Sequence, residues 1–422
     1  MNALLLSIAD GGGGAARAAH RLHQSLRKAD IDSHLLVQAK GTDDPTAITL
    51  QSKLEKGLAS LRPAINALPI KLFTEADSKT YSLQWLPERI ATKINQLDPE
   101  VINLHWICDG FLKIETLQRF KCPLVWTLHD MWPFTGGCHY SGECDRYTDH
   151  CGYCPQLESG KSSDFSSWVW QRKKRTFKAL DLTLVTPSQW LAECAQSSSL
   201  FKGHRVEVIP NGLDLQIYKP INAQLARQIL NLPQDKALIL FGAIQATSDR
   251  RKGFHFLQPI LQRLRQLRNH GDTHIVIIGS SAPIPPLDLG FETHYLGTLK
   301  DDYSLALAYA AADVFVAPSV QDNLPNTVLE AISCGTPCIA FKIGGMPDLI
   351  NHQSNGYLAH PFEIEDFAQG INWILDDQNR WRTLSEAARA KAEQEFTLEL
   401  QASRYQDLFH ELIESSRNTV TH

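Results

Sequence analysis

The sequence predicts an α/β protein made of two doubly wound units with mostly parallel sheets. Short apolar runs typical of buried parallel strands recur along the chain, separated by turn residues and amphipathic helical stretches. This alternation begins twice, at the N-terminus and again near residue 237. A chain of 422 residues has room for two or three domains, each with an ample core.

The expected strands can be placed from these apolar runs. In the first half they lie at 4–8, 33–38, 101–106, 123–130, 182–188 and 206–214. In the second half they lie at 237–243, 274–279, 293–297, 313–317 and 337–341. We expect residues 52–97 to form helices that cover the first unit. The Pro-Asn-Gly turn at 210–212 predicts three parts, namely an N-terminal domain, a C-terminal domain and a last helix able to pack back on the first domain: 1–212, 213–395 and 396–422.

Composition excludes several classes of protein. An apolar content of 43% and a charged content of 21% are ordinary for a globular protein. A net charge of −5 provides no basic field for nucleic acid. No apolar run approaches the roughly 20 residues that span a bilayer, and the N-terminus lacks the basic lead of a signal peptide, so a cytoplasmic location is expected. The odd number of cysteines, nine, argues against a disulfide scaffold.

One stretch, residues 318–331, organises the second half. Asp322 lies on a polar loop after an expected strand, and Glu330 lies eight residues later inside a helix that Pro325 can open. The backbone amides of residues 323–327 would point out of the helix N-terminus and favour an anion. Two carboxylates beside an anion site suit a ligand that is both a phosphate and a polyol. Taken alone, however, the pair is better explained as a helix-start acid and a surface residue.

Cations precede a helix in the same half. Arg250, Arg251 and Lys252 follow the expected strand 237–243 and stand just before Gly253. Three adjacent cations near the carboxyl end of a strand suit a diphosphate. In isolation, a solvated charge cluster explains them better.

The first half offers two further candidate features. Gly13 and Gly14 end a glycine run between the first strand and an alanine-rich helix, which is either a tight turn or a ligand loop. His105 and His129 each stand near the carboxyl end of an expected strand, the edge where open parallel sheets bind ligands. We favour His129 as the residue that faces a ligand.

A cysteine-rich loop, residues 131–165, follows the fourth expected strand. Its four cysteines have the spacing C-x5-C-x6-C-x2-C: Cys138, Cys144, Cys151 and Cys154. Four thiolates suit a tetrahedral structural zinc site, which would stabilise a long loop poor in aliphatic residues. Such a site leaves no open coordination position for catalysis. Disulfides and free buried thiols are the alternatives.

Together these motifs resemble the retaining glycosyltransferases of family 4, which have the GT-B architecture of two facing Rossmann-like domains. The resemblance covers nearly the whole chain. It is most specific in the E-x7-E-like segment 322–331 and the Cys-Gly-Thr-Pro motif that follows it at 334–337. The glycine loop and two short motifs, 209–214 and 251–253, support it. The branch it most resembles builds bacterial exopolysaccharide, colanic acid or O-antigen, where Asn-Leu-Pro-Asn-Thr and Gly-Gly-Cys-His-Tyr recur.

The resemblance implies a role for each candidate. Glu330 would bind the ribose hydroxyls of a nucleotide-diphosphate sugar donor, and Arg251 and Lys252 would neutralise its diphosphate. His129 would face the donor sugar. The glycines Gly13 and Gly14 would lie near the phosphates, and the loop after the strand would meet the sugar hydroxyls through Asp322, Asn323, Leu324, Pro325 and Asn326. A hexose would pass with retention to a glycan or lipid-linked hydroxyl, without a cofactor.

Two departures from the family pattern stand out. The first acid of the pair is Asp322 instead of Glu, which shortens its reach by one methylene. The cation that usually follows the first strand of the second domain is replaced by Ala243 and Ile244, so Arg250 or Arg251 would take its place.

A lipid-linked acceptor is compatible with a peripheral position at the inner membrane face, although no strong basic amphipathic helix is evident. An epimerase of the same architecture and a non-catalytic sugar or nucleotide binder are the competing functions.

Overall fold

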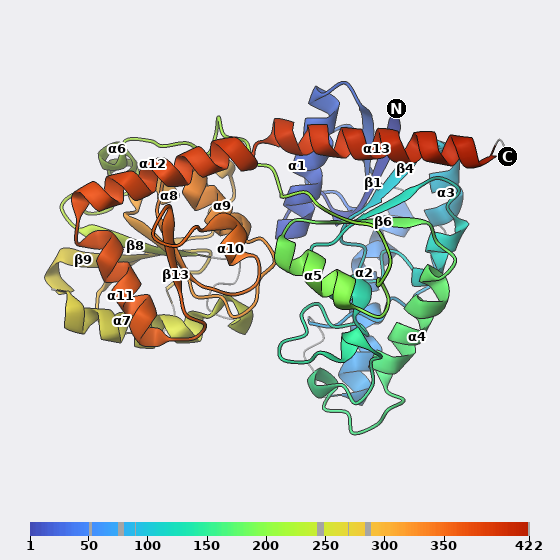
Figure 1. Ribbon diagram of the computed structural model, residues 1–422, viewed down its shortest axis with the longest axis horizontal. Coiled ribbons are helices and arrows are strands. Elements are labelled where there is room, and N and C mark those ends of the chain that lie inside the picture. The colour runs from blue at the N-terminus through green and yellow to red at the C-terminus, as the bar shows by residue number, and fades with distance from the viewer. Residues whose placement is uncertain are drawn as a thin grey trace. The chain divides into compact units, whose positions relative to one another are not determined.

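The computed structural model describes residues 1–49, 53–74, 80–88, 90–242, 249–268, 270–282 and 288–420 (Figure 1). The chain divides into two compact units. Unit 1 comprises Met1–Asn211 and Leu398–His422, and unit 2 comprises Gly212–Thr397. Each unit is an open sheet whose strands pair only in parallel, with apolar side chains packed on both faces.

Unit 1 contains a sheet in the order β3-β2-β1-β4-β5-β6-β7. Its strands are β1 Asn2–Ala9, β2 Asp32–Ala39, β3 Ala47–Thr49, β4 Val101–Leu104, β5 Leu124–Thr127, β6 Leu182–Thr186 and β7 Val206–Val208. Its α-helices are α1 Gly14–Lys28, α2 Lys53–Phe73, α3 Ile90–Leu97, α4 Phe165–Phe177, α5 Gln189–Ser197 and α13 Leu398–Val420. Its short 3-10 helices are η1 Ile114–Arg119, η2 Trp132–Phe134, η3 Arg146–Thr148 and η4 Pro155–Leu157.

Unit 2 repeats this plan with the order β10-β9-β8-β11-β12-β13. Its strands are β8 Ala237–Gly242, β9 Thr273–Ile278, β10 Glu292–Gly297, β11 Val314–Ala317, β12 Cys338–Phe341 and β13 Gly356–Ala359. Its helices are α6 Ala223–Ile229, η5 Arg250–Lys252, α7 Phe254–Leu267, η6 His270–Asp272, α8 Asp302–Ala311, α9 Asn326–Ser333, α10 Met346–Leu349, α11 Ile364–Leu375 and α12 Gln378–Glu395.

Both strand orders reverse direction once, between β1 and β4 in unit 1 and between β8 and β11 in unit 2. Ligands of open α/β sheets bind at such reversals, beyond the carboxyl ends of the strands. The candidate residues of each unit follow the carboxyl ends of these strands or of their neighbours.

The α/β prediction is confirmed, and several strand limits are wrong. The expected strand 206–214 ends at Val208, because Pro210 has no N–H to donate and a turn follows. The strands β3 and β13 were missed; each is short. Of the expected strand 237–243, residues up to Gly242 form β8, while Ala243 and Ile244 lie outside the described residues.

The last helix, α13, belongs to unit 1. Helix α13 packs against α1 (Figure 1). Tyr405 and Phe409 on α13 are fully buried in a cluster with Leu22 and Leu26 of α1. Unit 2 begins and ends at one place, since Leu213 N–H donates to the carbonyl of Phe396 at 2.9 Å. In the described part of the chain, no helix is long and apolar enough to cross a membrane.

Candidate active site

Two cations of unit 2 gather on one buried carboxylate. Lys252 Nζ donates to Asp322 Oδ2 at 2.6 Å, and Arg251 Nη1 lies 3.2 Å from the same oxygen. The pKa of Asp322 is raised by burial, but the two cations outweigh that effect and bring it below its ordinary value. The carboxylate is therefore ionised at neutral pH and anchors both cations.

Backbone contacts fix the position of this cluster. The carbonyl of Arg251 accepts from Val320 N–H at 2.9 Å, and the carbonyl of Asp322 accepts from Gly345 N–H at 3.1 Å. Gly253 has φ +75°, and a Cβ there would lie 1.7 Å from the carbonyl oxygen of Pro318, so only glycine allows this approach. Segments that follow β8, β11 and β12 thus meet around Asp322.

The three side chains differ in exposure in a way that suits anion binding. Asp322 is 8% exposed, whereas Lys252 and Arg251 retain 20% and 27%. An ammonium has three N–H donors and a guanidinium has five, so each can contact an anion without releasing Asp322. We expected Asp322 at sugar hydroxyls and the cations at a diphosphate. In the structure Asp322 is the counter-charge that positions those cations.

Glu330 lies inside α9 and is 2% exposed. Tyr309 Oη on α8 donates to Glu330 Oε2 at 3.0 Å. Burial, followed by the nearby Glu330 carboxylate, raises the pKa of Tyr309 well above its ordinary value, so the phenol stays a donor. The alternative of a surface helix residue is wrong for Glu330, because its side chain is buried and held by a defined partner.

The loop between the two acids, residues 323–326, packs closely. Asn323 and Leu324 are buried, and Pro325 occupies the N-cap of α9. The Asn323 N–H, expected to face an anion, donates instead to Asp322 Oδ1 at 3.1 Å. Asn326 is the first residue of α9. The role of this loop in ligand binding stays a prediction.

In unit 1 the glycine run joins β1 to α1. Gly12 has φ +88°, Gly13 is the N-cap of α1 and Gly14 is its first residue. A Cβ at Gly12 or Gly13 would meet no atom within 4 Å, so the backbone faces open space there. Asp10 supports the turn, accepting from Gly41 N–H at 2.6 Å and from the Thr42 hydroxyl at 2.6 Å. Open backbone at a helix start suits the approach of a phosphate.

The two candidate histidines of unit 1 contact each other. His105 Nδ1 and His129 Nε2 are 2.9 Å apart, with ring planes inclined by 23°. Burial lowers the pKa of His129 to about 4 and that of His105 well below its ordinary value. Both rings are therefore neutral at physiological pH, and the N–H of one donates a hydrogen bond to the ring nitrogen of the other. A neutral imidazole suits contact with a hydroxyl better than contact with a phosphate.

Asp130, next to His129, connects the strand edge to the cysteine-rich loop. Its Oδ2 accepts from Trp106 Nε1 at 2.8 Å and faces His139 Nδ1 at 2.7 Å. The His139 ring stacks on Trp106 and its Nε2 lies 3.0 Å from the hydroxyl of Ser82. This network holds the first part of the loop against β4 and β5.

The four cysteines of the loop are free thiols in the structure. Burial raises the pKa of Cys151 to about 12 and raises those of Cys138 and Cys154, so a metal would have to displace their protons. Where the structure describes side chains, one group of three or more His, Cys, Asp or Glu ligand atoms lies within 4.8 Å, and it contains none of these cysteines. Structural zinc in the loop stays a prediction.

Sequence reasoning missed three residues that shape these clusters. Tyr309 precedes Glu330 by 21 residues and lies on another helix, so no local sequence pattern predicts their contact. Asp10 was visible only as part of the glycine run. Gly344 has φ +51°, and a Cβ there would lie 2.0 Å from the carbonyl oxygen of Asp322. The Gly344-Gly345 pair after an expected strand was the available signal for it.

Two sequence families match the chain over adjacent segments. "Glycosyltransferase Family 4" matches residues 12–217, and "Glycosyl transferases group 1" matches residues 235–377. The chain belongs to the family 4 glycosyltransferases of GT-B architecture. This glycosyltransferase is 26% identical over 358 residues to the putative colanic acid biosynthesis glycosyl transferase WcaC of Escherichia coli, covering 81% of this chain and 83% of WcaC.

Other relatives match this glycosyltransferase over part of their length. Sulfoquinovosyl transferase SQD2 of Arabidopsis thaliana is 28% identical over 240 residues, which is 54% of this chain and 45% of SQD2.

Among solved structures, sucrose-phosphate synthase of Thermosynechococcus elongatus superposes with a TM-score of 0.70 at 21% identity, covering 98% and 99% of the two chains. HepE of Anabaena with UDP-glucose gives a TM-score of 0.65 at 19% identity, covering 98% and 100%. These structures establish the fold.

Proposed function

We propose that this glycosyltransferase transfers a hexose from a nucleotide-diphosphate sugar to a hydroxyl of a glycan or lipid-linked acceptor, in the assembly of bacterial exopolysaccharide or O-antigen. The observation that carries the donor assignment is the pair Lys252 and Arg251, held at the surface by the buried Asp322. A diphosphate is the ligand that suits two adjacent, preorganised cations. The likeness to WcaC, named for colanic acid biosynthesis, supports the polysaccharide context.

The reaction we propose retains the configuration of the transferred sugar. The bond between the anomeric carbon and the diphosphate oxygen breaks while the acceptor oxygen attacks the same face. The acceptor proton passes to the departing phosphate oxygen. Lys252 and Arg251 stabilise the negative charge that grows on that diphosphate. This route needs no nucleophile from the protein.

Ligand-induced thermal stabilisation followed by an assay tests this function. UDP, GDP, ADP and their hexose conjugates are screened first, since saturating a site at about 100-fold excess over Kd should stabilise the fold by about 2.7 kcal/mol. UDP-glucose is the first sugar to try, because HepE was solved with it. The selected donor is then incubated with lipid-linked and free glycan acceptors, and NMR reads the anomeric configuration of the product.

Each outcome separates the competing functions. Acceptor-dependent release of the nucleotide with a retained linkage supports the proposal. Conversion of the nucleotide sugar without an acceptor indicates an epimerase. Nucleotide binding without turnover on any acceptor indicates a non-catalytic binder, and an inverted product refutes the proposed stereochemistry.

We also propose that unit 1 contacts a membrane surface through α2. This helix buries Asn66 and Ile70 on one side and exposes an apolar stripe on the other: Leu61, Ile65, Leu68 and Leu72. A stripe with three- and four-residue spacing suits a helix that lies in a lipid interface.

A cavity beside α2 adds a small excess of positive charge. It has a volume of about 1070 Å³, and Phe73 and Trp168 line it together with four cations and three acids: Lys113, Lys161, Arg172, Arg175, Glu115, Glu158 and Asp164. Exposed aromatic rings next to lysine and arginine side chains suit anionic headgroups and an acceptor carried on a lipid. The sequence alone assigned this region no chemistry.

Introducing negative charge on the stripe should weaken membrane binding. The double variant Leu68→Glu with Leu72→Glu should lose at least about tenfold in partitioning to vesicles that contain anionic lipid, because it places two carboxylates in the interface. The matched control is Leu225→Glu with Ile229→Glu, an equally exposed apolar pair four residues apart on α6 of unit 2. Vesicle co-sedimentation measures both. Equal partitioning of the two double variants would refute the role of α2.

A further inference from the structure

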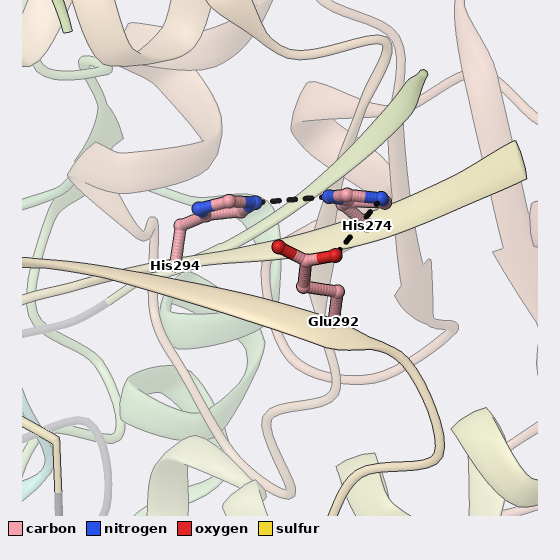
Figure 2. A group of neighbouring side chains, drawn as sticks. All are labelled: His274, Glu292 and His294. Carbon is pink, nitrogen blue, oxygen red and sulfur yellow. Dashed lines mark hydrogen bonds and ion pairs between the residues drawn. The ribbon is translucent and has the colours of Figure 1, made fainter. Parts of the chain in front are cut away.

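Three side chains at the edge of the unit 2 sheet converge on one another (Figure 2). His274 on β9 and Glu292 and His294 on β10 have ligand atoms that all lie within 4.8 Å. His274 is buried, His294 is partly buried and Glu292 is exposed, so solvent reaches the group from one side. None of the three has a part in the proposed transfer reaction.

Strand register brings these residues together. In the parallel pairing of β10 with β9, Glu292 stands opposite His274, and His294 follows two residues later on the same face. The sequence Glu-x-His therefore presents a carboxylate and an imidazole side by side, and His274 supplies a second imidazole from the neighbouring strand. β10 is the last strand of the sheet, and no further strand among the described residues covers this edge.

The distances are close to those of a coordination sphere. His274 Nδ1 and His294 Nε2 are 2.9 Å apart. Two imidazole nitrogens bound to one zinc ion at about 2.0–2.1 Å lie about 2.9–3.4 Å apart for bond angles between octahedral and tetrahedral. Without a metal, one of these nitrogens donates its N–H to the other, and the ring planes are inclined by 14°. An ion would replace that proton, and small ring rotations would aim both nitrogens at it.

Glu292 completes the set of ligands. Its Oε2 lies 3.6 Å from His274 Nε2, the ring nitrogen that does not face His294. At 3.6 Å this contact is not a hydrogen bond, so rotation of the exposed Glu292 side chain can bring a carboxylate oxygen to an ion held by His274 Nδ1 and His294 Nε2. The other carboxylate oxygen is turned toward the side of His294 in Figure 2.

We propose that His274, Glu292 and His294 form a binding site for a divalent transition-metal ion, with zinc as the probe. Two imidazole nitrogens and one carboxylate oxygen are borderline ligands that favour zinc, nickel, cobalt or copper over magnesium or calcium. Three protein ligands leave at least one position for water.

The proposed metal site is structural. His274 stands near the beginning of β9, four residues before Ile278, which corresponds to about 13 Å along the strand. The proposed donor contacts lie beyond the carboxyl-terminal ends of the strands in the same sheet, which is the end opposite to His274. An ion here would cross-link the exposed strand β10 to β9 and so secure an edge that has one hydrogen-bonded neighbour.

Calorimetric titration of zinc into the metal-stripped full chain tests the site. The variant His294→Gln should bind one zinc fewer than the wild type, or bind that zinc at least about tenfold more weakly, because one ligand of three is lost. Glu292→Gln should show the same change. Zinc bound by the cysteine-rich loop is common to all these proteins and cancels in the comparison.

A matched control uses the same motif without the second imidazole. Asp32-Ser33-His34 on β2 repeats the acid-x-His pattern, with 3.3 Å between His34 Nε2 and Asp32 Oδ1. His34→Gln should therefore leave zinc binding unchanged. Thermal unfolding in EDTA shows that each variant is folded. Identical zinc stoichiometry and affinity in the wild type, His294→Gln and Glu292→Gln would overturn the proposal, as would loss of nucleotide binding in His294→Gln.

Discussion

Replacing Lys252 with alanine should weaken binding of the nucleoside diphosphate by about ten- to a hundredfold and leave binding of the nucleoside unchanged. A hydrogen bond from a charged donor contributes about 1.5–3 kcal/mol, and each 1.4 kcal/mol is a tenfold change in Kd. Asp322 keeps Arg251 as its partner in this variant, so the fold should persist. Calorimetric titration with both ligands measures the effect.

Lys236 supplies the control for this experiment. It lies one residue before β8, its side chain is 27% exposed, and it also faces carboxylates, with Asp235 at 3.8 Å and Asp272 at 3.9 Å. It thus stands at the opposite end of β8 from Lys252. Lys236→Ala should leave both affinities unchanged. If Lys252→Ala weakened nucleoside and nucleoside diphosphate binding equally, the proposed phosphate contact would be wrong.

Replacing Glu330 with glutamine should lower donor affinity by about tenfold or more. We expect the carboxylate to accept two ribose hydroxyls, and an uncharged amide accepts more weakly and offers one oxygen fewer. Glutamine is a more specific substitution than alanine, because its carbonyl can still accept the hydrogen bond from Tyr309 Oη. Alanine would leave that buried hydroxyl without an acceptor. Turnover should fall with binding.

Two comparisons separate a ribose contact from a structural role. The wild type should lose affinity for a 2′,3′-dideoxynucleoside diphosphate, whereas Glu330→Gln should bind it as well as it binds the ribonucleotide. Tyr309→Phe removes the phenol that holds Glu330 but keeps the carboxylate, so the preference for ribose should survive in it. Wild-type affinity in Glu330→Gln, or an unchanged preference for ribose, would exclude Glu330 from the donor site.

The architecture could be predicted from the sequence because parallel strands buried on both faces leave continuous apolar runs. The runs that became β9 and β12 are examples. The same logic placed His105 and His129 near strand ends, where the structure has them. The strand limits failed where pairing depends on hydrogen bonds that hydropathy does not encode, as at Pro210. Two strands were missed because a short run that includes Thr or Gly, as β3 and β13 do, gives a weak apolar signal.

The candidate site was harder to predict because partners come from distant segments. Arg251 and Lys252 were expected at an anion, and Asp322 was expected at hydroxyls 70 residues later, but no local pattern showed that they pair. The same holds for the contact between the two histidines and for the phenol on Glu330. Long-range side-chain pairs depend on the register of whole strands and helices, which local sequence leaves open.

The path of the chain through unit 2 has a practical consequence. Residues 212–397 leave and rejoin unit 1 at a single place, where Leu213 pairs with Thr397, while both chain termini belong to unit 1. Unit 2 is therefore a continuous insertion with adjacent ends, the geometry that makes a domain transplantable. A hybrid enzyme could receive this cassette from another glycosyltransferase through two neighbouring junctions, so that donor preference could be exchanged while the core of the recipient stays intact.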